Sequence, residues 1–94
     1  MIEYVWDETK NQRNIDKHGI DFCDAYRIYE STIKMTLIAT GCYAESRWID
    51  VSPMGETLCL LVYTLREKQV RCISMRKASK KERKLYYEHN ETYQ

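Results

Sequence analysis

The feature that most constrains the fold is a pair of strand-like runs, Leu58 to Thr64 and Val70 to Met75. The first run is apolar at nearly every position, which is typical of a central strand covered on both faces by the chain or by a partner protein. The turn between the runs, around Arg66 to Lys68, is too short for a crossover helix. The two strands are therefore predicted to be antiparallel neighbours, and the rest of the chain must supply elements that cover them.

Two helices are predicted ahead of this hairpin. The first runs from Glu8 to about His18, because Asp7 is suited to cap its start and Gly19 is suited to end it in a left-handed conformation. The second runs from Phe22 to Tyr29 behind a cap at Asp21, because apolar side chains recur there at one helical face.

The first of these helices is very polar. Ile15 is its only large aliphatic residue, and Lys10, Asn14, Lys17 and His18 share one side at spacings of four, three and one. Burial gives such a helix little stability. Its polar side either faces a substrate or another element, or the helix is simply a solvated surface element, and the sequence leaves both interpretations open.

The remaining elements complete the fold class. Alternating side chains predict strands from Ile33 to Thr40 and from Arg47 to Val51, with a hairpin loop at Pro53 to Glu56. A last helix is predicted from Lys80 to Tyr87, opened by a capping box in Ser79 to Glu82. The order predicts an α+β domain with two N-terminal helices, a four-stranded antiparallel sheet and a C-terminal helix.

The 94 residues are enough for a single domain with a small core. No apolar run approaches the roughly 20 residues of a membrane span, and Glu3 stands where a signal peptide carries cations, so a cytoplasmic location is expected.

The cysteines, Cys23, Cys42, Cys59 and Cys72, form no C-x-x-C pair, which favours buried reduced thiols over a zinc site. The sequence contains no metal-ligand cluster and no Gly-rich phosphate loop, so no metal or cofactor is expected.

Charge is distributed unevenly along a chain whose net charge is only +1. Residues 66–84 contain nine cations and two acids, a net charge of +7, whereas residues 1–65 contain six cations and ten acids. A basic face of this kind can bind phosphates on a nearly neutral protein. Arg76, where the last predicted strand ends, is a sharper candidate than any single lysine, because a guanidinium binds phosphate bidentately.

Such a set of side chains is sufficient for one reaction. Cleavage of RNA without a metal needs a base for the 2′-hydroxyl, an acid for the leaving 5′-oxygen and cations for the charge of the phosphorane. The substrate supplies the nucleophile, and Arg, Lys, Tyr or His can fill the other roles. Composition does not separate this activity from simple binding of nucleic acid.

Motifs at both ends of the chain resemble those of the BrnT-type toxins of bacterial type II toxin–antitoxin systems, a branch of the RelE-like ribonucleases. The N-terminal matches are Trp6, Asp7, Lys10, Asn14, Lys17, His18, Gly19, Phe22 and Ala25. The C-terminal matches are Arg71, Ile73, Ser74, Arg76, Lys77, Ala78, Glu82, Arg83 and Tyr86. Glu45 and Arg47 fit the acid and arginine that precede the second strand in this family.

The resemblance implies a RelE-like fold, with helices packed on a four-stranded antiparallel sheet. It implies metal-independent RNA cleavage that stops translation. The expected partner is a small antitoxin with a ribbon-helix-helix domain, in a hetero-oligomer that blocks the active surface of the toxin and binds promoter DNA only through the antitoxin.

By position, the resemblance assigns Arg76 to transition-state charge, Arg66 and Lys77 to phosphate binding, and His18 and Tyr86 to proton transfer. His18 is equally compatible with a structural role at the helix end. Further RNA contacts are expected from Arg71, Lys80, Lys81, Lys84 and Lys17. The three lysines of the last helix are equally compatible with a plain solvated surface.

Three positions depart from the family pattern. Leu65 stands where many relatives have a glutamate, Lys77 where many have an arginine, and Met75 where a small residue is common. If the glutamate is a proton carrier, this copy is weak or inactive. The rival interpretations are a non-catalytic family member that binds an antitoxin or nucleic acid, and an unrelated small domain with a basic face.

Overall fold

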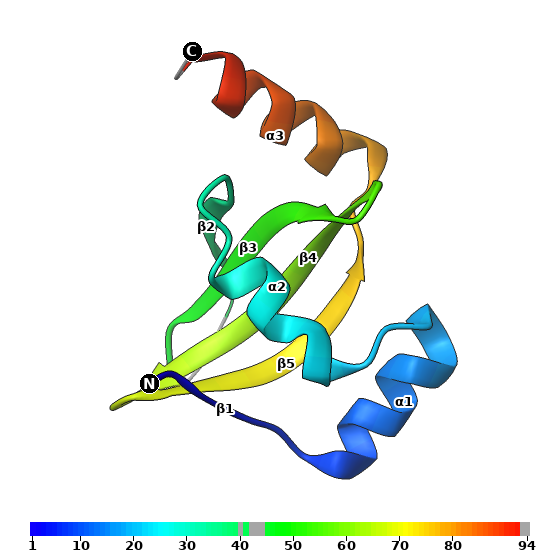
Figure 1. Cartoon of the computed structure of the whole chain (residues 1–94), viewed down its shortest axis with the longest axis vertical. Helices are drawn as coiled ribbons and strands as arrows, with labels where there is room; N and C mark the ends of the chain where they lie inside the picture. Colours follow the sequence, from blue (N-terminus) through cyan, green and yellow to red (C-terminus); the bar gives the residue numbers. More distant parts are fainter. Residues whose placement is uncertain (40, 42–44, 93–94) are drawn as a thin grey trace.

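The computed structural model of the chain, which describes residues 1–39, 41 and 45–92, is an α+β structure with helices packed on one sheet (Figure 1). In chain order the elements are β1 (Glu3–Val5), α1 (Glu8–His18), the 3-10 turn η1 (Phe22–Asp24), α2 (Ala25–Tyr29), β2 (Met35–Ala39), β3 (Arg47–Met54), β4 (Thr57–Arg66), β5 (Gln69–Lys77) and α3 (Lys80–Thr92). The predicted fold class is confirmed, while two of its details are wrong.

The described sheet has five strands rather than the predicted four, and it is mixed rather than wholly antiparallel. Its order is β1-β5-β4-β3-β2. The four predicted strands do form an antiparallel meander with β4 in the centre. β1 adds to the free edge of β5 in parallel, with Tyr4 opposite Val70. Three residues are too few to show an alternation pattern, so this pairing leaves almost no local signal.

The second predicted helix is a 3-10 turn followed by a short α-helix. The Asp21 carboxylate accepts the Cys23 N–H at 2.9 Å, and the Ala25 N–H bonds to the Phe22 carbonyl three residues back. This spacing tightens the first turn into 3-10 geometry. Asn11 anchors the same turn by accepting the Phe22 N–H at 2.8 Å.

The remaining helix and strand boundaries agree with the predicted ones to different degrees. α1 has the predicted bounds, because the Asp7 carboxylate accepts a first-turn N–H at 3.0 Å and Gly19 adopts a φ of 71°. β3 and α3 are longer than predicted and reach Met54 and Thr92, whereas β2 starts only at Met35.

Of the three cysteines that the structure describes, two are buried and one is exposed. Cys59 and Cys72 are buried free thiols, as predicted, but Cys23 is exposed. Burial raises the pKa of the Cys72 thiol to about 12, which keeps it protonated at neutral pH. Cys42 lies outside the described residues.

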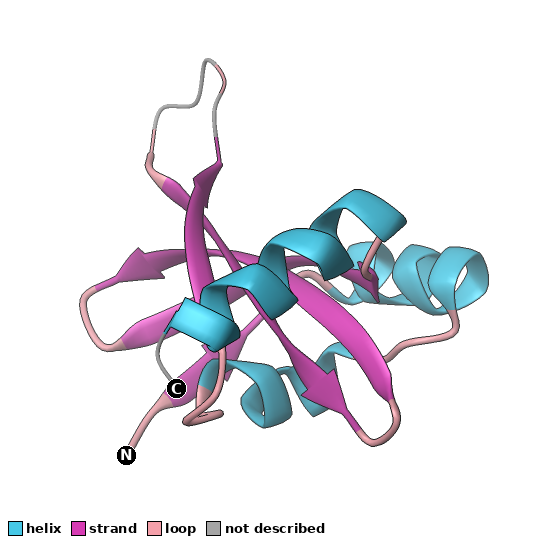
Figure 2. Ribbon diagram, turned by 90° about the horizontal axis from the view of Figure 1, so that it is seen from above, coloured by secondary structure: helices cyan, strands magenta, loops and turns pink. Residues whose placement is uncertain are grey.

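Alternation along β4 divides the core into two clusters on opposite faces of the sheet. On one face, which we call the α2 face, Leu61 and Tyr63 pack in a cluster with Phe22. On the other, which we call the α3 face, Leu60 packs in a cluster with Tyr86. Figure 2 shows α3 lying across the sheet. The central strand is thus covered on both faces, as its sequence predicts.

The edge of β5 beyond β1 is sealed by a side chain. β1 pairs only with residues 69–71 of β5, and α1 lies next along that edge (Figure 1). The buried Asn14 amide donates to the Met75 carbonyl at 2.9 Å and accepts the Met75 N–H at 3.1 Å. It also donates to the Ile20 carbonyl at 2.9 Å. One amide group therefore makes the two bonds that a neighbouring strand would make, so the polar side of α1 does face another element.

Replacing Asn14 with leucine is expected to lower the free energy of unfolding by roughly 3 kcal/mol, because buried backbone groups of Met75 and Ile20 lose their partners. Urea unfolding of the two proteins measures the difference. Gln12→Leu is the matched control, because Gln12 is exposed on the same helix and its side chain donates to Asp16 of that helix. Equal urea midpoints for the two variants would contradict the edge-sealing role of Asn14.

Candidate functional site

A bulge in β5 determines which side chains share a face. The successive β4 residues Val62 and Tyr63 pair with Ser74 and Cys72, so Ile73 is an extra residue in β5. An extra residue resets the in-and-out alternation of a strand. The buried positions of β5 show this reset, since 70, 72 and 75 are spaced by two and then by three.

The reset places Arg71 and Arg76 on the same face, together with Arg66 of β4. Arg76 pairs with Leu60, a residue of the α3-face core. Lys77 follows on the α2 face, so the predicted basic pair diverges to opposite sides of the sheet. Arg66 pairs with Gln69 and therefore lies roughly 20 Å from Arg76 along β5. These arginines share a face without forming one compact cluster.

Arg66 forms a two-pronged ion pair with Glu45. Its Nε lies 3.1 and 2.9 Å from the two carboxylate oxygens, and its Nη2 also donates to Oε1. The hydrogen bonds from Arg66, supported by the charges of Arg71 and Arg47, hold the pKa of Glu45 below its usual range. The Arg66 and Glu45 side chains are 55% and 39% exposed. The carboxylate is therefore ionised at neutral pH and accessible from solvent.

Arg76 forms a second two-pronged pair, with Glu82 of α3. Its Nη1 and Nη2 donate to the two carboxylate oxygens at 2.8 Å each. Glu82 also accepts the Ser79 N–H at 2.7 Å, and Ser79 Oγ accepts the Glu82 N–H at 3.2 Å. This is the predicted capping box. These bonds, led by those from Arg76, lower the pKa of Glu82 to about 2.

The two pairs differ in how easily their arginines are released. Exposed ion pairs contribute little net stability, so a phosphate can displace Glu45 from Arg66 at small cost. Glu82 is less exposed and also caps α3, so freeing Arg76 would weaken the start of that helix. Arg66 is therefore an available anion ligand, whereas Arg76 mainly ties β5 to α3.

A groove between α1 and β5 brings further cations together. It has a volume of about 300 Å³ and is lined by Lys10, Arg13, Lys17, His18, Ile73 and Ser74, among others. Burial, with added effects from the charges of Lys17 and Arg76, lowers the pKa of His18. The structure thus brings together three of the sequence-predicted site residues, namely His18, Lys17 and Arg76, at one end of β5.

The predicted site residues of α3 are not among the side chains that line this groove. Lys80, Lys81 and Lys84 are exposed. Tyr86 is 2% exposed, and its hydroxyl donates to the Ile33 carbonyl at 2.8 Å. This geometry explains Tyr86 as a core residue, and its assignment to proton transfer stays a prediction.

Residues 6–82 match the model of a protein family described as the ribonuclease toxin, BrnT, of type II toxin–antitoxin systems. The matched segment runs from the end of β1 into the first turn of α3, so it contains both arginine pairs and the α1 groove. The chain belongs to the BrnT toxin family. The resemblance seen in the sequence is thereby confirmed. Membership implies an RNA substrate and an antitoxin partner. No curated protein matches the chain.

The structure places the departures from the BrnT pattern away from the Arg66 pair. Leu65 is 46% exposed and pairs with Val70 of the α2-face core, so a glutamate at position 65 would face away from Arg66. Met75 is a fully buried core residue. The carboxylate that meets Arg66 comes from Glu45, 21 residues earlier in the chain. The sequence comparison named Glu45 as a family match and gave it no role.

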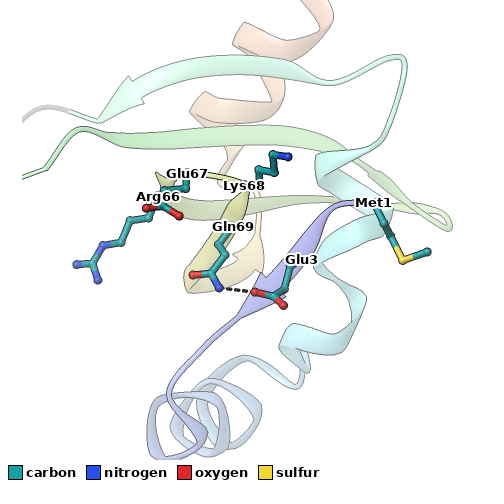
Figure 3. Close-up of a pocket in the computed structure, with 6 residues that line it drawn as sticks. All are labelled: Met1, Glu3, Arg66, Glu67, Lys68 and Gln69. Carbon is teal, nitrogen blue, oxygen red and sulfur yellow. Dashed lines mark hydrogen bonds between the residues drawn. The ribbon is translucent and has the colours of Figure 1, made fainter.

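A hollow at the β4–β5 turn is lined by Met1, Glu3, Arg66, Glu67, Lys68 and Gln69 (Figure 3). It has a volume of about 580 Å³. The Gln69 side chain donates to Glu3 across it, while the Arg66 guanidinium points away toward Glu45. Two carboxylates offset its two cations, so this hollow is a poor site for an anion.

Within the described residues, no group of three or more His, Cys, Asp or Glu side chains is arranged to hold a metal ion. None of the helices in the described part of the chain is both long enough and apolar enough to span a membrane.

The Arg76–Glu82 pair predicts a pH dependence of stability. Because folding lowers the pKa of Glu82 from 4.5 to about 2, the pair stabilises the fold above about pH 5 and this contribution is lost as the pH falls toward 2. Glu82→Gln is expected to cost roughly 1–2 kcal/mol at pH 7, after allowance for screening, and much less at pH 2. Unfolding in denaturant at each pH measures this. Glu56→Gln, in an exposed turn, is the control; a pH-independent deficit in Glu82→Gln would refute the linkage.

Proposed function

We propose that this chain is a metal-independent endoribonuclease whose reactive centre lies on the α3 face around Glu45, Arg66 and Arg71. The observation that carries the proposal is the Glu45 carboxylate, which is partly exposed, is paired with Arg66 and feels the charges of Arg71 and Arg47. A carboxylate in such a place can accept a proton while its neighbours bind phosphate.

The proposed reaction uses the 2′-hydroxyl of the RNA as its nucleophile. The scissile phosphate displaces Glu45 from Arg66, and the freed carboxylate takes the proton of the 2′-hydroxyl. Arg66 and Arg71 stabilise the charge that gathers on the phosphorane oxygens. The bond to the 5′-oxygen then breaks as that oxygen takes a proton from solvent, which leaves a 2′,3′-cyclic phosphate and a 5′-hydroxyl.

His18 and Arg76 form a second candidate centre, because the charge of Arg76 acts on the imidazole of His18. The family resemblance assigns His18 to proton transfer and Arg76 to transition-state charge. Three N–H groups of Arg76 already bond to Glu82 and the Lys77 carbonyl. We therefore assign Arg76 to the joint between β5 and α3 rather than to the reaction, and we assign peripheral contacts with the RNA backbone to the exposed lysines Lys80, Lys81 and Lys84.

The biological setting follows from the resemblance and is part of the proposal. RNA cleavage stops translation in the cytoplasm, and a ribbon-helix-helix antitoxin neutralises the toxin in a hetero-oligomer. That complex binds its promoter DNA through the antitoxin. An acidic antitoxin surface over Arg66 and Arg71 would compete directly with RNA for the same guanidinium groups.

Cleavage of a labelled RNA in the presence of a chelator tests the proposal. The intact protein is expected to cut, whereas Glu45→Gln and Arg66→Ala are each expected to lower the rate roughly 100-fold or more, because they remove the base and a phosphorane ligand. Arg27→Gln is the control, because Arg27 is an exposed cation of α2. Its rate is expected to match that of the intact protein.

The outcomes separate the candidate centres. A large loss in His18→Gln and Arg76→Ala, with full activity in Glu45→Gln, would move the reaction to the α1 end of β5. If the intact protein cuts neither free RNA nor ribosome-bound RNA, the non-catalytic interpretation replaces the ribonuclease. Activity that a chelator abolishes would refute the metal independence.

A further inference from the structure

Three cations of α1 have no role in the reaction just described. Lys10, Arg13 and Lys17 recur at spacings of three and four, so they form one stripe along the helix. All three are exposed, and no described carboxylate forms an ion pair with Arg13 or Lys17. Like charges at this spacing repel and weaken a helix. An anion bound along the stripe would relieve that repulsion.

The stripe forms one wall of the groove between α1 and β5. Ile73 and Ser74 form the facing wall, at the bulge of β5. Ser74 pairs with Val62, a residue of the α3 face, so this wall continues the face that carries Arg71. The groove therefore opens beside the proposed reactive centre, toward the edge of the sheet.

The side chains that line this groove favour the binding of negatively charged groups. Among the described residues that line it are Lys10, Arg13 and Lys17, and none of them is a carboxylate. The hollow at the β4–β5 turn, by contrast, contains Glu3 and Glu67 (Figure 3). A groove lined by cations without acids concentrates anions.

The groove is also held in shape without a ligand. Asn14, which contributes to its lining, is bonded to both backbone groups of Met75. This fixes the distance between α1 and β5, so a ligand does not have to order the two walls on binding.

We propose that this groove binds a phosphate of the RNA strand a short way along the backbone from the one that is cleaved, so that the substrate runs along β5 from Arg71 to α1. This inference rests on the proposed ribonuclease function. Arg71 and Ser74 are three residues apart in β5, roughly 10 Å, which a short piece of single-stranded backbone spans. The contacts are to phosphate, so they position the strand without reading its bases.

The test measures binding of a labelled 2′-O-methyl RNA, which lacks the nucleophile, over a series of salt concentrations. Arg13→Gln and the double variant R13Q/K17Q are expected to weaken binding several-fold and roughly tenfold. Each lost phosphate contact lowers the salt slope by about 0.7. Arg27→Gln removes the same charge from α2 and is expected to leave both affinity and slope unchanged. Arg13→Lys keeps the charge and is expected to keep the slope.

Cleavage kinetics provide a second measurement. With cleavable RNA, R13Q/K17Q is expected to raise KM while kcat at saturation stays unchanged, because the groove binds a part of the substrate that does not react. A loss of kcat with unchanged KM would overturn the binding role. An unchanged salt slope in R13Q/K17Q, in a protein that still cuts RNA, would refute the groove alone.

Two further outcomes also count against the proposal. Loss of antitoxin binding by R13Q/K17Q, with RNA binding intact, would make the groove a protein contact. Absence of both binding and cleavage in the intact protein would remove the proposed function together with the groove.

Discussion

The pairing of Asn14 with the backbone of Met75 is the interaction on which the functional surface depends. A polar helix such as α1 gains little from hydrophobic burial, so it needs another reason to stay on the sheet. The amide of Asn14 provides it by satisfying the N–H and carbonyl of an otherwise open strand edge. The same contact holds Lys17 and His18 beside β5. The contact that completes the strand edge therefore also positions the cations of α1 beside β5.

The two arginine–glutamate pairs show that similar contacts can have different uses. Both have forked geometry, but Glu82 also caps a helix and is only 21% exposed, whereas Glu45 is 39% exposed. Burial and a second partner make the first pair a joint between β5 and α3. Exposure leaves the second free to exchange its partner for a phosphate. The strongly lowered pKa of Glu82 therefore reflects a structural role in this protein. Glu45, which is held more weakly, is the better candidate for a catalytic carboxylate.

The sequence predicts those parts of the fold whose causes are local. Asp7 and Gly19 define α1, and Ser79 with Glu82 defines the start of α3, because each cap acts within one helical turn. The parallel pairing of β1 with β5 escapes prediction because the two strands lie at opposite ends of the chain. The Glu45–Arg66 pair escapes for the same reason, since the intervening strands must first pair. Arg76 and His18 are predicted from motif resemblance, but no pattern reveals that Glu82 engages Arg76.

The bulge at Ile73 has an evolutionary consequence. Its extra residue is what turns Arg76 toward α3 and Lys77 toward the opposite side. Deleting Ile73 would remove the bulge and leave Arg76 opposite Leu60 on the α3 face, so the arginine would still meet Glu82. A regular strand that kept every residue would instead exchange the two side chains. A homologous chain can therefore lack one residue at the bulge and still present the same basic surface. Alignments of this segment need to be built on strand register rather than on matched letters.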